Sequence, residues 1–260
     1  MALTYTSYLK TEELLELQEL KSSPAQHDEL LFIIIHQTYE LWFKQILHEI
    51  DLLREEMEAG HPWAALKTMR RILVIMKTLV GQNDILETMT PLSFSSFRKF
   101  LESASGFQSV QFRELEILLG MRHKRMFSLH EADSAAFKQL TKRTEESTIW
   151  ESFIKLLQKM GYKVEAPKRE NESGLMFNPS QEMQDVIFDI MNDKSEIGLL
   201  CESLVDFDEG LQEWRYRHVK MVERTIGNKM GTGGSDGVQY LKNTLFNAVF
   251  PDLWEVRTRF

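Results

Sequence analysis

Cysteine is almost absent from this chain of 260 residues, in which Cys201 is the only one. A single thiol excludes an internal disulfide framework and any zinc or iron–sulfur site that needs several cysteines. Proline and glycine are also few, with 6 and 13 residues, and apolar residues rarely alternate with polar ones as they do in strands. Together these absences favour an all-α fold.

Long apolar runs are absent as well. The longest, residues 30–35, is far too short to span a bilayer, and the opening segment MALTYTSYLK lacks the apolar core of a signal peptide. The net charge of −8 comes without a basic stripe, which argues against nucleic acid as the main partner. We therefore expect a cytoplasmic protein with no membrane or nucleic-acid partner.

What the chain does contain is helical periodicity. Apolar residues recur at spacings of three and four along most of its length, which predicts a bundle of long antiparallel helices. The expected helices are residues 28–59, 63–87, 90–101, 107–119, 181–192, 195–226 and one that begins near 238. We expect residues 1–10 to be extended and Thr11 to cap a short helix that follows them.

Residues 122–179 differ from the rest of the chain. Short helices expected near 135–141 and 148–159 alternate there with polar loops, and 166–179 has no periodicity. We therefore expect a helical core made of residues 1–121 and 180–260, with 122–179 as a smaller helical excursion.

The most informative stretch is LQEWRYRHVKMVERTIGNKMGTGGSDG, residues 211–237. Trp214 and His218 share the apolar face of a helix that should end at Gly227. His218 is the one polar side chain on that face, whereas Arg215 and its charged neighbours fall off it, toward solvent or partners. The glycine-rich loop GTGGSDG that follows satisfies neither of the phosphate-binding glycine motifs.

A second histidine, His36, has a similar setting, because Phe32, Tyr39 and Phe43 share its helix face. A lone histidine on an apolar face is usually a core residue hydrogen-bonded to a carbonyl. Two such histidines among aromatic residues also suit the two faces of a haem, so both interpretations stay open. A carboxylate-bridged di-iron site is not supported, because the only Glu-x-x-His pair is interrupted at a helix end. A hydrolase is not supported either, because the sequence has no GxSxG motif.

Arg98 lies on one predicted helix face with Phe94 and Leu101. An arginine in such a place either extends its charged end to solvent or offers its planar guanidinium to a carboxylate. The pattern alone does not decide between the two.

Four segments resemble bacterial tryptophan 2,3-dioxygenases, in the same order. They are LTYTSYL (3–9), HDELLFIIIHQTYELWFKQILHEI (27–50), FRKFLESASGFQSVQFRELEILLG (97–120) and EWRYRHVKMVERTIGNKMGTGGSDGVQYL (213–241), about a third of the chain. HQTYELWFK together with RYRHVKMV and GTGGSDG is highly specific. The resemblance implies a haem enzyme that inserts both atoms of O2 across the indole C2–C3 bond of L-tryptophan. The product would be N-formyl-L-kynurenine, in the first step of tryptophan catabolism by the kynurenine pathway.

The resemblance also implies roles for single residues. His218 matches the proximal iron ligand of haem b, with one haem per subunit. His36 matches the distal histidine, which faces the indole N–H and does not bind iron. Arg98 matches the arginine that clamps the substrate carboxylate, and Thr232 the threonine that helps hold the amino-acid group.

Further matches concern the walls of the site. Pocket positions against the indole ring or the haem match Phe32, Phe94, Leu101 and Ser105. Tyr5 and Tyr8 match tyrosines that a neighbouring subunit contributes to each site of the family's homotetramer. Asp236 departs from the family, which usually has serine there, and this puts the electrostatics of the loop in question.

Two other functions remain open at this point. A close relative could act on a modified indole or hydroxylate it, although Arg98 and His36 favour plain L-tryptophan. A haem carrier or sensor without turnover would have no need of Arg98 or of the glycine-rich loop.

Overall fold

The computed structural model describes residues 2–121, 124–128, 130–166, 178–227, 229, 231, 238–242 and 245–260, and every statement below concerns these residues. Within them the chain forms helices and no β-strand, as the periodicity predicts. The α-helices are α1 (Tyr5–Leu9), α2 (Thr11–Leu15), α3 (His27–Ala59), α4 (Pro62–Leu86), α5 (Pro91–Phe97), α6 (Val110–Leu118), α7 (Lys124–Ser128), α8 (Ala135–Glu145), α9 (Ile149–Lys159), α10 (Gln181–Asn192), α11 (Glu196–Ile226), α12 (Val238–Lys242) and α13 (Pro251–Glu255). The 3₁₀ turns are η1 (Arg98–Leu101), η2 (Gly106–Gln108) and η3 (Val256–Arg259).

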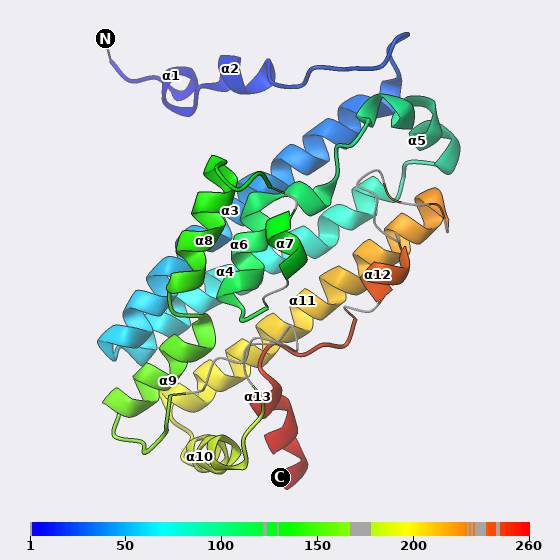
Figure 1. The fold of residues 1–260 in the computed structure, drawn as a ribbon. Coiled ribbons are helices and arrows are strands. Elements are labelled where there is room, and N and C mark those ends of the chain that lie inside the picture. Colours follow the sequence, from blue (N-terminus) through cyan, green and yellow to red (C-terminus); the bar gives the residue numbers. More distant parts are fainter. Residues whose placement is uncertain are drawn as a thin grey trace.

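Three long helices, α3, α4 and α11, run side by side through the length of the molecule (Figure 1). α3 and α4 form the antiparallel pair that the sequence predicts, and α4 packs against both other helices. The tight connection requires Gly60, whose φ of +86° lies in the left-handed region that glycine adopts without strain. Pro62 then starts α4, at a position where the missing N–H costs nothing.

One large apolar cluster holds these helices together. Leu53 of α3, Met69 of α4 and Leu204 of α11 are fully buried in it. Truncating one such side chain to alanine typically costs about 2–5 kcal/mol. Phe153 of α9 lies in the same cluster, so this part of 122–179 packs into the main core. The division of the chain at 122–179 stays a prediction.

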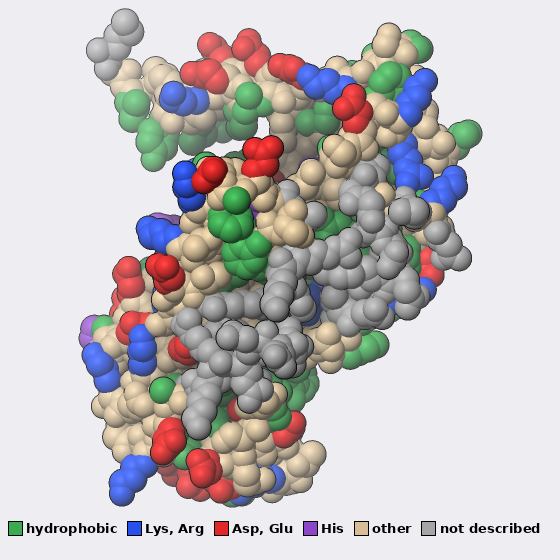
Figure 2. Space-filling view, in the orientation of Figure 1, with side chains coloured by type: hydrophobic (Ala, Val, Ile, Leu, Met, Phe, Trp, Pro, Cys, Tyr) green, Lys and Arg blue, Asp and Glu red, His purple; other side chains and the backbone are tan. Residues whose placement is uncertain are grey.

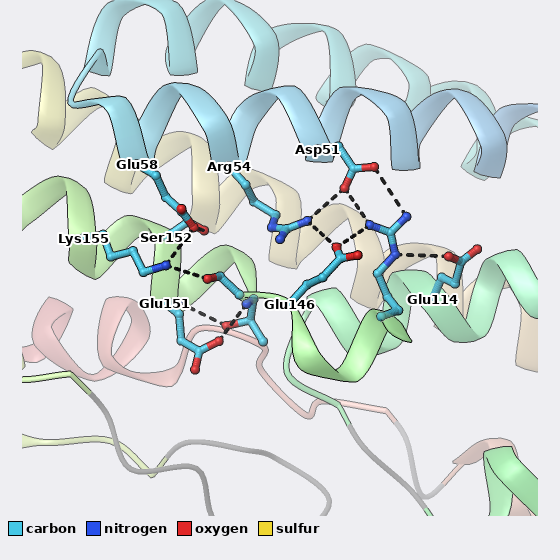
Figure 3. A network of polar contacts seen from close by, with 11 residues as sticks. Asp51, Arg54, Glu58, Glu114, Glu146, Glu151, Ser152 and Lys155 are labelled. Carbon is cyan, nitrogen blue, oxygen red and sulfur yellow. Dashed lines mark hydrogen bonds and ion pairs between the residues drawn. The ribbon is translucent and has the colours of Figure 1, made fainter. Parts of the chain in front are cut away.

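A network of ion pairs attaches α8 to the bundle (Figure 3). Arg143 of α8 lies between carboxylates, with Nη1 2.8 Å from Asp51 Oδ1 on α3 and Nε 3.1 Å from Glu114 Oε1 on α6. Glu146 accepts from both Arg143 and Arg54, at 2.8 and 3.1 Å. The side chains are partly buried, so the network is less screened by solvent than an exposed pair and fixes the position of α8.

The C-terminal segment is fastened to α11 by one buried carboxylate. Asp208 Oδ2 accepts hydrogen bonds from the backbone N–H groups of Val249 (2.8 Å) and Phe250 (3.1 Å) and from Trp254 Nε1 (3.0 Å). Asp208 is fully buried, and these donors offset the cost of removing a charge from water. The periodicity did not predict α13 or η3, because both are short.

The N-terminal residues form an arm, residues 2–16, that extends away from the bundle (Figure 1). The expectation that residues 1–10 are extended is wrong, since Thr4 caps helix α1 through the N–H of Ser7. Thr11 is not the capping residue of α2 either, because it is the first residue of that helix. Lys10 precedes α2 with a φ of +52°, so the chain turns there between the two short helices.

The base of the arm is fixed to α3 by a buried acid. The carboxylate of Glu29 accepts from the backbone N–H groups of Lys21 (2.8 Å) and Ser22 (3.0 Å) and from the Ser22 hydroxyl. The arm itself has no buried residue in either helix, and Leu3, Tyr5 and Leu15 are each about three-quarters exposed. Figure 2 shows its apolar side chains standing free of the body of the chain. Among the described residues no helix combines the length and apolar character that crossing a membrane requires.

Candidate functional site

His36 projects from the first half of α3, and its tautomer is fixed by its own helix. The ring nitrogen Nδ1 lies 2.6 Å from the carbonyl oxygen of Phe32, one turn earlier. A carbonyl can only accept, so Nδ1 carries the hydrogen and Nε2 of the neutral ring has a free lone pair. Burial lowers the pKa of His36, although Glu40 one turn later opposes this, and the neutral form is therefore favoured.

The side chain of His36 is accessible to solvent in this chain. The ring of Phe32 covers one side of it, with its centroid 4.1 Å from that of the imidazole. An exposed imidazole beside an aromatic ring can reach a molecule that binds against that ring.

An aromatic cluster forms the wall next to His36. Phe32 contacts Phe94 and Phe97 of α5, with ring centroids 5.7 and 5.5 Å apart. The same apolar cluster includes Leu101 of η1 and Met221 of α11, one turn beyond His218. Residues from three distant segments therefore meet here, and the wall is the kind of apolar surface against which an indole ring packs.

His218 lies on α11, and its environment holds it neutral. Burial, with a smaller contribution from His36, lowers the pKa of His218 to about 4. Phe32, one turn before His36, and Met221, one turn after His218, belong to the same apolar cluster. The two histidines therefore come to the same part of the fold, although one is near the start of the chain and the other near its end. The indole of Trp214, one turn earlier, stacks parallel to the imidazole of His218, with centroids 5.4 Å apart and planes 2° apart.

These two histidines fit a haem better than a metal ion held by protein alone. In the described part of the chain no group of three His, Cys, Asp or Glu side chains could hold a metal ion. A haem iron needs only one or two ligands from the protein, and a neutral imidazole is the form that binds. The ring of His218 makes no hydrogen bond to any described residue, so its lone pair is not already engaged. The neutral imidazole of His218 is therefore a suitable ligand for a haem iron.

The remaining pocket candidates come from the segment after α5. The sequence predicts Phe94, Arg98 and Leu101 on one face of a continuous α-helix, but the α-helix ends at Phe97 and the tighter turn η1 begins at Arg98. Arg98 is partly buried beside the aromatic cluster. Ser105 caps η2 by accepting from the N–H of Phe107 at 3.4 Å.

Thr232 lies outside the described residues, as does most of its loop. Two other predicted site residues are not brought to this place. Tyr5 and Tyr8 are 76% and 69% exposed on the arm, so a single chain does not carry them to His36. That is consistent with a site completed by another subunit, which stays a prediction.

The position of Arg215 differs from the one that the periodicity predicts. Arg215 was expected to lie off the apolar face, toward solvent or partners, but it is 6% exposed and donates from Nη2 to Met121 Sδ at 2.7 Å within the chain. Sequence reasoning also missed Glu40, one turn after His36, which accepts from Gln111 Nε2 at 2.8 Å. The i+4 spacing of His36 and Glu40 was the available signal.

Comparison with known proteins shows the family of the chain. Residues 1–165 and 181–260 match the sequence profile of the family described as tryptophan 2,3-dioxygenase. The tryptophan 2,3-dioxygenase of Herpetosiphon aurantiacus is 50% identical over 258 residues, 98% of each chain. That of Anaeromyxobacter dehalogenans is 48% identical over 98% of this chain and 96% of its own, and that of Caulobacter vibrioides 40% identical over 99% and 98%. The chain belongs to the tryptophan 2,3-dioxygenase family.

Proposed function

We propose that this protein oxidises L-tryptophan with O2 to N-formyl-L-kynurenine, using one haem b per subunit. The observation that carries the proposal is that α3 and α11 bring His36 and His218 to one apolar cluster, which contains Phe32 and Met221 of the same two helices. Membership of the family supports the reaction, and the aromatic wall beside His36 supports an indole as the substrate.

His218 would hold the haem by binding its iron through the imidazole, and the cluster around Met221 would supply apolar surface beside it. When bound, the haem supplies the iron chemistry that activates O2. The protein has to bind the substrate, orient it and keep water away from the reacting atoms. The partly buried ring stack of Trp214 and His218 and the buried rings of Phe94 and Phe97 would help to keep water away from this region.

His36 would orient the indole. Its Nδ1–H is committed to the carbonyl of Phe32, so Nε2 is left to accept a hydrogen bond from the indole N–H. This bond fixes the rotation of the ring against Phe32 and the other apolar residues of the wall. The C2–C3 bond is then presented to the oxygen in one orientation, which is the main contribution that positioning makes to such a reaction.

Arg98 and Thr232 would hold the amino-acid end of the substrate. A guanidinium binds a carboxylate through two parallel N–H donors, and Arg98 lies at the edge of the aromatic wall. Phe32, Phe94 and Leu101 would contact the indole, and Ser105 would line the same pocket. With one end clamped and the ring held by His36, the substrate has no freedom to slide.

We also propose that the protein is a cytoplasmic homotetramer in which the arm carries Tyr5 and Tyr8 to a neighbouring site. The apolar side chains of the arm are exposed in the single chain, and burying them against another copy would remove that surface from water. Deleting residues 1–16 should lower both the oligomeric state, measured by sedimentation, and the affinity for tryptophan.

A mixing experiment tests the reaction itself. The ferrous haem protein is combined with L-tryptophan without oxygen and then mixed with buffer containing O2. Absorbance of the formylated product should appear, with one O2 consumed per product formed. A haem carrier or sensor would bind O2 without forming product, and a hydroxylase would give an indole whose ring is still closed.

A further inference from the structure

Trp214 stands in a specific relation to the proposed iron ligand. It precedes His218 by one turn of α11, and the two rings are parallel to within 2° with centroids 5.4 Å apart. Parallel planes at this distance describe an offset stack, the arrangement that aromatic rings favour. The flat face of the indole thus overlaps part of the imidazole and holds its plane.

Trp214 is itself held by aromatic residues of two other helices. Its ring lies 5.2 Å from that of Phe112 on α6, and 6.3 and 6.4 Å from those of Tyr39 and Phe43 on α3. Tyr39 is fixed in turn, because its hydroxyl donates to the carbonyl of Leu79 on α4 at 2.9 Å. The orientation of the indole is therefore set by α3, α4 and α6 together.

The polar atom of Trp214 does not explain why tryptophan is used here. Nε1 is buried and forms no hydrogen bond of good geometry in the described part of the chain. It lies near the Tyr39 hydroxyl, whose pKa burial raises to about 12 while the indole N–H opposes the rise. A buried donor without an acceptor costs stability, and a phenylalanine would avoid that cost. What tryptophan adds is a larger flat face toward His218.

We propose that Trp214 is a positioning residue that fixes the rotation of the His218 imidazole, and so the direction of its metal-binding nitrogen. The proposal rests on the proposed function, in which His218 binds the haem iron. The ring torsion of a histidine has a broad energy minimum, so a ligand histidine needs an external restraint. In metal sites a hydrogen bond to the second ring nitrogen usually supplies it, but no described residue bonds the ring of His218. The stack with Trp214 supplies the restraint on the ring of His218 instead.

Two substitutions of Trp214 distinguish the effect of its flat ring from the effect of its apolar volume. Trp214→Phe keeps an aromatic plane against His218, and Trp214→Met fills the space with a flexible chain that has no plane. Trp214→Leu is a second non-planar filler if the Met variant does not fold. Phe153→Leu is the matched control, because it removes a fully buried ring of the same core on α9, where that ring packs against Trp150.

The measurements are the iron–histidine stretching band of the ferrous holoprotein in resonance Raman spectra and the rate of haem transfer to excess apomyoglobin. We expect the Met and Leu variants to broaden or shift the band and to lose haem at least about tenfold faster, as loss of a restraint on a metal ligand does. The Phe variant and Phe153→Leu should keep the parental band. An unchanged band and haem-loss rate in the non-planar variants would overturn the proposal. A parent protein without any iron–histidine band would instead contradict His218 as the ligand, and with it both proposals.

Discussion

Nδ1 of His36 donates to the carbonyl oxygen of Phe32, 2.6 Å away on the preceding turn of α3. This short contact decides which nitrogen of the imidazole is available, because the other one, Nε2, must carry the lone pair. The same turn of helix places the ring of Phe32 against His36, 4.1 Å between centroids. One helical turn thus supplies both an acceptor and an apolar surface for a flat N–H-bearing ring.

His36→Ala should keep the haem and lose part of the activity, since His36 is not the iron ligand in our proposal. The loss should depend on the indole N–H. The parent should bind 1-methyl-L-tryptophan, which lacks that hydrogen, more weakly than L-tryptophan by about 0.5–1.5 kcal/mol, the net value of one hydrogen bond. In the variant this preference should disappear. Equal preference in parent and variant would show that Nε2 has no bond to the indole.

His218→Ala should abolish stable haem binding, because the site would lose its axial ligand. The ratio of haem absorbance to protein absorbance after gel filtration measures this directly. His48→Ala, which removes an exposed histidine of α3, is the control and should retain full haem content. Retention of haem by the His218 variant together with loss by the His36 variant would reverse the assignment.

Arg98→Leu should weaken tryptophan binding severely and leave the haem spectrum unchanged. Removing one partner of a buried charge pair costs roughly 2–5 kcal/mol, or about 30- to several-thousand-fold in affinity. Tryptamine, which has no carboxylate, should bind parent and variant about equally. Lys99→Leu removes the neighbouring exposed charge and should change neither affinity. A parent that handled tryptamine as well as tryptophan would refute the clamp.

Glu29→Gln should loosen the base of the arm. Burial raises the pKa of Glu29, but the hydrogen bonds from Ser22 and Lys21 outweigh it, so the pKa lies below its ordinary value. The unfolded chain therefore binds more protons than the folded chain as the pH falls. The stability that the charged Glu29 contributes is complete above about pH 4.5, and it is lost as the pH falls through the pKa of Glu29 in the folded protein.

The test of Glu29 is urea unfolding of the parent and of Glu29→Gln between pH 3 and 7. The difference in the free energy of unfolding should shrink as the medium becomes more acid. Glu12→Gln, at an exposed position on the arm, should follow the parent throughout. A difference that stays constant with pH would mean that the charge of Glu29 does not hold the arm.

The sequence predicts the long helices well because each buries a broad apolar face. The helices α3, α4, α10 and α11 begin and end within a residue or two of their predicted limits. Gly60 and Gly227 end α3 and α11, and Pro62 begins α4, each through its own backbone properties. The short elements were missed or misjudged. α1 depends on a single cap at Thr4, and η1 departs from the α-helix at Arg98 without a change in periodicity.

The site was predictable only in part, for a physical reason. Spacing places His36 and His218 on apolar faces, but it does not tell which helix faces meet, and that depends on how α4 packs between α3 and α11. The burial of Arg215 depends likewise on a neighbour, Met121, from a distant segment. The resemblance to the family supplied the roles that spacing could not.

The three donors that Asp208 receives from the C-terminal segment have a consequence for synthesis on the ribosome. Asp208 lies in the middle of α11, and Val249, Phe250 and Trp254 are synthesised after it. Until they leave the exit tunnel, the nascent helix carries a carboxylate that cannot be buried without a large penalty. We therefore expect the bundle to close only after residues 249–254 have left the tunnel, so that nascent chains stopped short of residue 249 remain open.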